Sequence, residues 1–155
     1  MQKRKLSNNL KHEIVKKIGG NSVYYGKLSE MLQKIIDQRK IEALSYDEYL
    51  RQVVELAEAI LHPESSMEYP DAVKDSAAKR ALYDFFDKNE ELAVSVDKAI
   101  RTALRPGWKK NYQKQQVIRG AIYESLVDCG YSEEDAANTY SDIYDMAQRQ
   151  DEYDG

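Results

Sequence analysis

The 155-residue chain is poor in the residues that crosslink or interrupt a polypeptide. Cys129 is its only cysteine, so the sequence holds neither a disulfide framework nor a CxxC redox or zinc pair. With seven glycines and three prolines, turns are sparse and the secondary-structure elements should be long. No apolar run approaches the ~20 residues of a membrane span, and no signal-peptide pattern opens the chain. We therefore expect a cytoplasmic protein with no membrane partner.

Motifs that carry catalysis are also missing. Residues 20–27 place five residues between two glycines where a phosphate-binding loop has four, and Leu28 stands where that loop needs Ser or Thr. Pro70-Asp71 matches the first half of a PD-(D/E)xK nuclease motif, but no Asp or Glu lies two residues before a Lys. Neither His12 nor His62 has a His, Cys or carboxylate four residues later, as a helical metal site would. We expect no catalytic residue, no cofactor and no metal site.

What the sequence does contain is helical periodicity. Short connections favour antiparallel neighbours, so we predict an all-α fold, a single globular domain of about seven helices with mostly antiparallel neighbours. Ser45 and Ser132 are expected to cap the third and seventh helices, and Gly130 to end the sixth. The apolar ladders that define the seven helices span 10–18, 28–43, 50–61, 78–86, 92–104, 117–126 and 136–147.

The third of these helices has the most regular pattern. Its apolar residues recur at helical spacing and predict a single buried stripe. We assign 1–155 to one helical domain, with N-terminal helices over 1–44 and the main helical body over 45–150. The residues of the predicted buried stripe are Leu50, Val53, Val54, Ala57, Ile60 and Leu61.

Charge is arranged in blocks, although the formal net charge is only −4. Residues 1–40 carry net +7, residues 41–100 net −8, residues 101–128 net +4 and residues 129–155 net −7. Such blocks either pair with one another inside the fold or give the surface an asymmetric charge that orients a partner. The sequence leaves both alternatives open.

The segment from Arg101 to Arg119 is the candidate contact surface. Its basic side chains suit phosphates or acidic partners, and its aromatic rings suit base stacking or anchoring of a partner protein. We expect its lysines to be solvated. Trp108 follows a Pro-Gly turn and is either an exposed anchor or core, and we favour core. The candidate residues are Arg101, Arg105, Trp108, Lys109, Lys110, Tyr112, Lys114 and Arg119.

Three features in a fixed order resemble one protein family. They are the helix YLRQVVELAEAI over 49–60, the element ALYDFF over 81–86, and Trp108 followed by an amphipathic helix that ends at Gly130-Tyr131. Over 46–147 the chain is thereby similar to the C-terminal helical domain of the restriction subunit (the R or motor subunit) of type I restriction-modification enzymes.

The resemblance implies a helical domain of a much larger polypeptide. Such subunits carry a nuclease domain and an ATP-driven DNA translocase upstream, and their C-terminal helices pack on this motor and dock to the methyltransferase and specificity subunits. The family's catalytic motifs lie outside the similar stretch, so no catalytic residue carries over. The expected partners are the remainder of the R subunit and the methyltransferase and specificity subunits. The alternative is a helical nucleic-acid-binding domain that uses 101–119.

The purified chain should therefore neither cleave DNA nor hydrolyse ATP, with or without magnesium. The reason is the missing Asp/Glu-x-Lys half of the nuclease motif and the defective phosphate loop. Plasmid nicking and phosphate release, followed across successive purification steps, check this. Magnesium-dependent turnover that accompanies the chain through every step would contradict it.

Overall fold

The computed structural model describes residues 2–66 and 68–154, with side chains from residue 6 onward. The two terminal residues and Met67, which falls in the loop expected between the third and fourth helices, lie outside the described residues. All regular elements in the described part are helical, which confirms the all-α prediction. The chain divides into two compact units, unit 1 up to Glu68 and unit 2 from Tyr69. That these units act as one domain stays a prediction.

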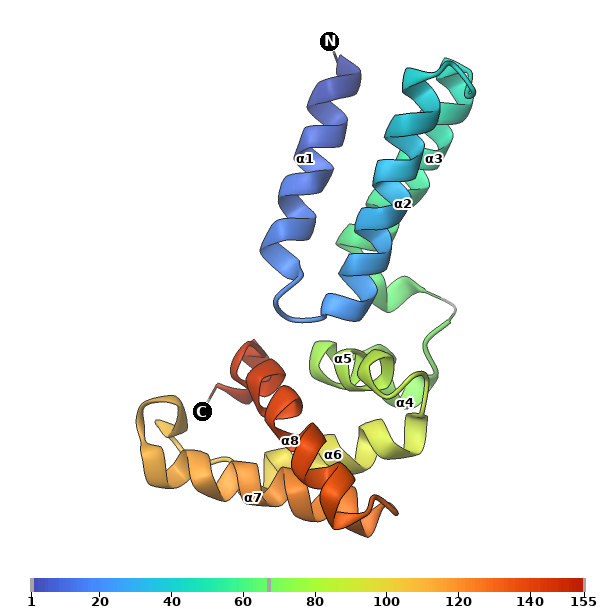
Figure 1. Ribbon diagram of the computed structural model, residues 1–155. Helices are drawn as coiled ribbons and strands as arrows, with labels where there is room; N and C mark the ends of the chain where they lie inside the picture. Colours follow the sequence, from blue (N-terminus) through green and yellow to red (C-terminus); the bar gives the residue numbers. More distant parts are fainter. Residues whose placement is uncertain (1, 67, 155) are drawn as a thin grey trace. The chain divides into compact units, whose positions relative to one another are not determined.

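Unit 1 is a three-helix bundle of α1 (Gln2–Lys17), α2 (Ser22–Lys40) and α3 (Tyr46–Leu61). A short 3-10 turn at Pro63–Ser65 follows α3. Consecutive helices run antiparallel (Figure 1). Because α3 packs with the two helices before it, the compact unit extends past the predicted subdivision at residue 44.

Side-chain caps determine where several helices begin. Asn21, Ser45 and Ser132 each accept a hydrogen bond from the backbone N–H three residues later. The predicted caps at Ser45 and Ser132 are thus confirmed. Gly130 has a φ of 106°, the left-handed conformation expected at the end of the sixth predicted helix. The helix α2 begins well before its first predicted apolar position because Asn21 caps it there.

The burial pattern of α3 differs from the prediction. Val54 is 60% exposed and Leu61 is 48% exposed, so the prediction of one buried stripe is wrong for these two residues. Val54 and Leu61 lie seven residues apart, on one face of the helix, and belong to a second apolar stripe beside the buried one. Only the first stripe faces the bundle interior, where α3 buries Tyr49, Val53, Leu56 and Ile60.

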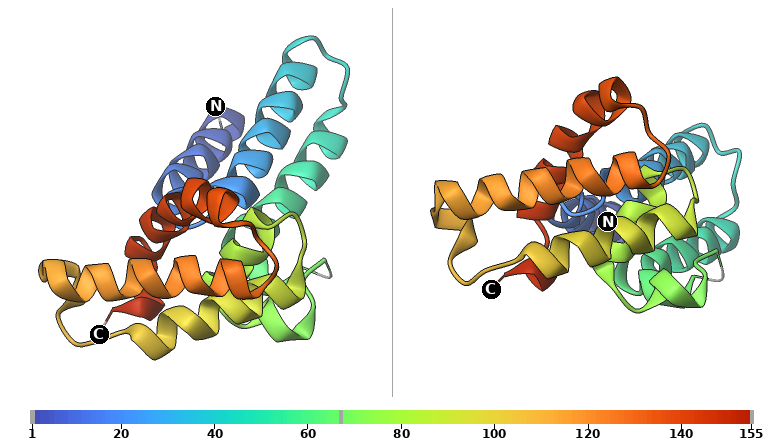
Figure 2. Two further views of the ribbon diagram at one scale, coloured as in Figure 1. Left: turned by 60° about the horizontal axis from the view of Figure 1, so that its bottom comes forward. Right: turned by 90° about the horizontal axis from the view of Figure 1, so that it is seen from below.

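Unit 2 contains five helices in the described residues, and α6 and α7 lie side by side and antiparallel (Figure 2). The described residues hold eight helices, in agreement with the prediction of about seven; the additional one is a four-residue helix over Asp71–Lys74, between the third and fourth predicted helices. None of the described helices combines the length and apolar character needed to cross a membrane. The elements of unit 2 are α4 (Asp71–Lys74), α5 (Ala77–Phe85), α6 (Glu90–Ala103), a 3-10 turn (Trp108–Lys110), α7 (Tyr112–Asp128), α8 (Glu133–Gln148) and a second 3-10 turn (Asp151–Tyr153).

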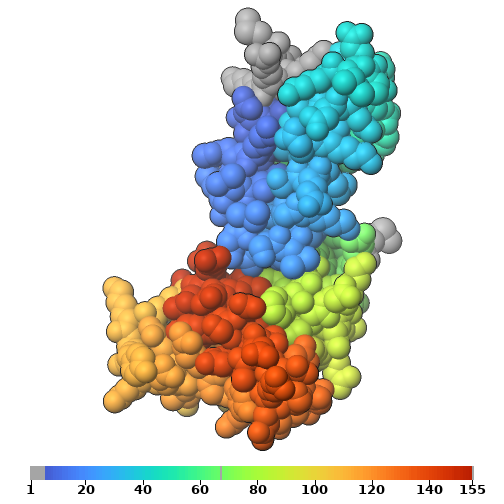
Figure 3. All heavy atoms as spheres, viewed as in Figure 1, coloured from blue at the N-terminus to red at the C-terminus, as the bar shows by residue number. Residues whose placement is uncertain are grey.

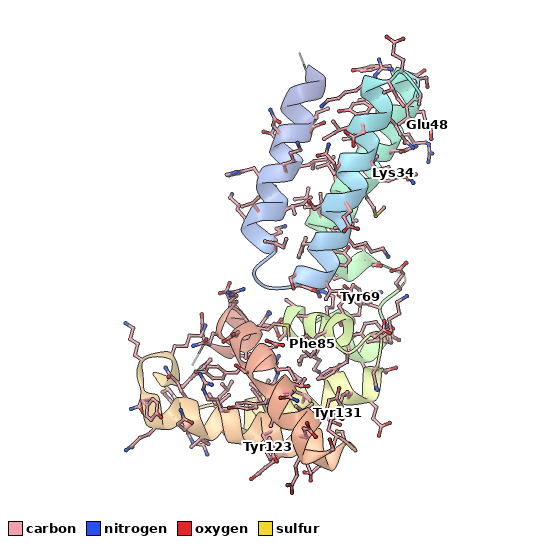
Figure 4. All side chains as sticks on the ribbon, viewed as in Figure 1. Lys34, Glu48, Tyr69, Phe85, Tyr123 and Tyr131 are labelled. Carbon is pink, nitrogen blue, oxygen red and sulfur yellow. The ribbon has the colours of Figure 1, made fainter. Side chains whose placement is uncertain are left out.

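Tyrosine supplies much of the aromatic core. Six of the twelve tyrosines are buried, and the hydroxyls of Tyr49, Tyr69, Tyr144 and Tyr153 form hydrogen bonds inside the fold. In unit 1 the Tyr49 hydroxyl lies 2.7 Å from Ser7 Oγ. In unit 2 the hydroxyl of Tyr69, which is labelled in Figure 4, donates to Asp84 at 2.5 Å. A buried phenol needs such a partner because an unpaired hydroxyl in an apolar environment is costly.

Candidate docking surface

Trp108 lies in the connection between α6 and α7. Gly107, with φ 75°, turns the chain through the left-handed region into the 3-10 turn that Trp108 begins. Trp108 is 1% exposed, and its indole N–H donates to the carbonyl of Tyr153 at 2.7 Å. Its ring makes an edge contact with Tyr144, with 6.2 Å between centroids. The core alternative is confirmed, which removes Trp108 from the candidate contact surface.

Arg101 belongs to an internal network around the buried carboxylate of Asp97. Its Nε lies 3.0 and 2.9 Å from the two Asp97 oxygens, and its Nη2 donates to Glu152 at 2.7 Å. The Tyr153 hydroxyl donates to Asp97 at 2.6 Å, so the buried charge is fully hydrogen-bonded. We call Asp97, Arg101, Trp108, Glu152 and Tyr153 the C-terminal clasp.

Glu152 in the clasp also caps α5. Its carboxylate accepts hydrogen bonds from the Ser76 hydroxyl at 2.6 Å and the Ala78 N–H at 3.2 Å. Burial opposes ionisation, but the bonds from Ser76, Arg101 and the α5 backbone outweigh it and lower the pKa of Glu152 below its ordinary value. Burial, together with the nearby Asp97 carboxylate, raises the pKa of Tyr153. A phenol is protonated at neutral pH even at its ordinary pKa of about 10, so Tyr153 is the donor in its bond to Asp97.

Arg119 packs between α7 and α8. Its guanidinium carbon lies 4.1 Å from the centroid of the buried Tyr144 ring, within the range of a cation–π interaction. Burial raises the pKa of Tyr144, and the Arg119 charge acts against that rise. The half-buried Arg119 thus supports the helix pair instead of extending a surface stripe.

Four candidate residues at the α6–α7 connection and the start of α7 form no ion pair in the described structure, and we call Arg105, Lys110, Tyr112 and Lys114 the basic tip. Arg105 is exposed and donates to the last carbonyls of the α6 end, at 3.1 and 2.7 Å. The half-buried Lys114 donates from Nζ to the carbonyl of Pro106 at 2.6 Å. Lys110 is exposed, and its side chain has no hydrogen bond or ion pair within the described chain. Tyr112 is 74% exposed.

Lys109 does not belong to the basic tip. Its ammonium group forms an ion pair with Asp154 and lies 5.6 Å from the centroid of the Trp108 ring. The expectation that the lysines of this segment are solvated is therefore wrong for Lys109, holds only in part for the half-buried Lys114, and holds for Lys110. Reversing the charge of Lys109 would place two carboxylates together at the end of the clasp.

The charge blocks pair only in part. The ion pairs Arg101–Glu152 and Lys109–Asp154 join the 101–128 block to the 129–155 block. Much of α8 lies at the surface of unit 2 (Figure 3). The acidic side chains of α8 form no ion pair in the described structure. Internal pairing and an asymmetric surface therefore coexist. The unpaired acidic residues of α8 are Glu133, Glu134, Asp135, Asp142 and Asp145.

Open hollows occur in both units. One of about 550 Å³ in unit 1 is lined by basic side chains that include Lys11, Arg39 and Lys40. A groove of about 570 Å³ between α6 and α7 is lined mainly by small residues such as Ala99 and Ala121. Among residues 6–66 and 68–154, no group of three or more His, Cys, Asp or Glu side chains is placed to hold a metal ion.

Sequence reasoning missed the partners that hold the basic segment from within. Asp97 and Arg101 stand at i, i+4 spacing on α6, a local signal for an ion pair. Glu152 and Tyr153 had no such signal, because their partners in the clasp lie at least 45 residues earlier. Both residues follow the last predicted helix and belong to no predicted helix or motif.

Comparisons with protein-family models, with curated proteins and with solved structures find no match to this chain. The family assignment therefore depends on the sequence resemblance alone and is a proposal.

Replacing Trp108 with Ala should lower the free energy of unfolding by about 3–5 kcal/mol, the usual cost of removing a large buried aromatic side chain. The matched control is Tyr112→Ala, which removes an exposed ring from the same connection and should stay within about 0.5 kcal/mol of wild type. Urea denaturation of the full chain measures both. An unchanged midpoint for Trp108→Ala would contradict its core position.

Glu152→Gln should destabilise the chain by about 1–2 kcal/mol at pH 6, because charge-assisted hydrogen bonds to a partly exposed carboxylate are weakened. Since folding lowers the pKa of Glu152, its ionised form stabilises the fold above the ordinary value of 4.5, and this contribution is lost as pH falls through the lower folded value. The difference between wild type and Glu152→Gln should therefore shrink between pH 6 and pH 3. Urea denaturation at both values, with the exposed Asp151→Asn as control, measures this. A pH-independent difference would refute the ionic role.

Proposed function

We propose that this chain is a helical docking module without catalytic residues of its own, and that it belongs to the restriction subunit of a type I restriction-modification enzyme. The observation that carries the docking role is the basic tip. Its cations form no ion pair in the described structure, while Arg101 and Lys109 pair with carboxylates and Arg119 packs on an aromatic ring. The identity of the parent enzyme comes from the sequence resemblance.

The basic tip is held in a defined conformation, which favours a docking role. Trp108 anchors one side of the connection, and Asn111 caps α7 on the other by accepting from the Lys114 N–H at 3.0 Å. Gln115 donates to the carbonyl of Lys109 at 2.9 Å across the same turn. A surface that is already ordered loses less conformational entropy on binding than a mobile one.

In the proposed assembly, the basic tip meets an acidic surface of the methyltransferase–specificity core. Exposed charges at the edge of an interface mainly set the association rate and the orientation of the partners, while buried apolar contacts set the lifetime of the complex. DNA translocation and cleavage would be activities of the parent polypeptide. Co-purification of the chain with the methyltransferase and specificity subunits tests the role, and failure to co-purify would count against it.

A nucleic-acid contact is the second candidate. It is favoured by Tyr112, whose exposed ring stands beside the cations of the tip and suits stacking on an unpaired base. The salt dependence of binding distinguishes the two functions. The logarithm of the association constant for duplex DNA falls by about 0.9 per contacted phosphate for each tenfold rise in salt concentration. Binding of DNA with that slope, without binding to the protein core, would favour this alternative.

Lys110→Glu should slow association with the methyltransferase–specificity core by a factor on the order of 3–10 and flatten its salt dependence, with little change in dissociation. Folding should be retained because the Lys110 side chain has no internal partner in the described structure. Lys98→Glu is the matched control, since it reverses one exposed charge on α6 outside the tip. Surface plasmon resonance at two salt concentrations gives the rates. Equal association rates for wild type and Lys110→Glu would rule out docking through the tip.

A further inference from the structure

Exposed apolar side chains concentrate in unit 1. Among the described residues, nine of the eleven large hydrophobic side chains that are exposed belong to it. On α3 they form a continuous row, in which half-buried Leu50 and Ala57 link the exposed positions. The successive spacings of four, four, three and four residues keep the row on one helix face. We call this row the outer stripe, and its members are Tyr46, Leu50, Val54, Ala57 and Leu61.

Beyond its first residue, the outer stripe faces away from α2. Tyr46 itself lies beneath Arg39 of α2, whose guanidinium carbon is 5.9 Å from the centroid of the Tyr46 ring. The Tyr24 hydroxyl of α2 donates to the carbonyl of Ala59 at 2.7 Å, which marks the side of α3 that α2 covers. At about 100° per residue, Val54 and Leu61 lie roughly 140° and 160° around the helix from Ala59. The stripe spans about 22 Å at ~1.5 Å per residue, the length of four helical turns. It is long enough to receive another helix along its whole length.

The edge of the outer stripe that carries Asp47 and Glu58 is acidic. Asp47 lies three residues before Leu50, and Glu58 lies three residues before Leu61, so both share the face of the stripe. Neither carboxylate forms an ion pair in the described chain. The one basic residue on this side of α3, Arg51, is already held by Glu55 and by Glu48, which is labelled in Figure 4.

We infer that the outer stripe of α3 is the docking site for an amphipathic helix of a partner protein, one whose apolar face is flanked by lysine or arginine. The apolar row would bury against the partner's apolar face, and Asp47 and Glu58 would meet its basic flanks. A second copy of the chain fits less well, because pairing two outer stripes brings acidic borders together. The inference goes beyond the proposed function, because the outer stripe belongs to unit 1 and suits a basic partner, whereas the basic tip belongs to unit 2 and suits an acidic one.

Two synthetic peptides of roughly 18 residues (~27 Å as helices) test this on the full chain. Both carry leucine at i, i+4, i+7 and i+11, but one has lysine flanks and the other glutamate flanks. Fluorescence anisotropy should give saturable binding of the lysine peptide and at least about tenfold weaker binding of the glutamate peptide. The double variant Val54→Glu, Leu61→Glu should weaken the lysine peptide at least about tenfold. Val23→Glu, an equally polar change at a 50% exposed position of α2, should leave it unchanged.

The single variant Glu58→Lys should reduce the ratio between the affinities for the lysine peptide and the glutamate peptide. A purely apolar contact would leave this ratio unchanged. Equal affinity for the two peptides, no saturable binding, or insensitivity to the Val54 and Leu61 changes overturns the inference. Sedimentation that reveals a dimer, dissociated by Val54→Glu, would assign the stripe to a second copy and also overturn it. A chain that assembles with the methyltransferase–specificity core yet ignores both peptides would keep the docking role and reject this surface.

Discussion

The buried carboxylate of Asp97 is the constraint on which unit 2 depends. At 2% exposure it tolerates its charge only because Arg101 and Tyr153 hydrogen-bond to it from two sides. The carbonyl of Tyr153 accepts a hydrogen bond from the Trp108 indole, and the adjacent Glu152 caps α5. One buried charge thereby ties the last described residues of the chain to the start of α5, to α6 and to the α6–α7 connection.

This constraint divides the basic segment into two parts with different roles. Arg101, Lys109 and Arg119 use their charge inside unit 2, against carboxylates or an aromatic ring. The cations of the basic tip form no ion pair in the described structure, and the turn that carries them is held in place by the buried Trp108. The number of basic residues in the segment is therefore larger than the number of unpaired cations that a partner can contact, because some of them form ion pairs within unit 2.

Local signals in the sequence predicted most of the helices and their ends. Ser45, Ser132 and Gly130 act on neighbouring backbone atoms, so their roles follow from the residue and its position. The prediction of a buried position is wrong for Val54 and Leu61 because periodicity locates apolar faces without telling which face another helix covers. The clasp joins residues 45 to 56 positions apart, and no local pattern specifies such a pairing.

Docking through the basic tip is the central claim, and hydrogen–deuterium exchange tests it most directly. The full chain would be compared alone and in the presence of the methyltransferase and specificity subunits. The account predicts slower amide exchange over residues 105–114 on assembly, with little change around Asp97 and Tyr153, whose contacts already exist in the free chain. Unchanged exchange over 105–114 in a chain that demonstrably assembles would contradict it.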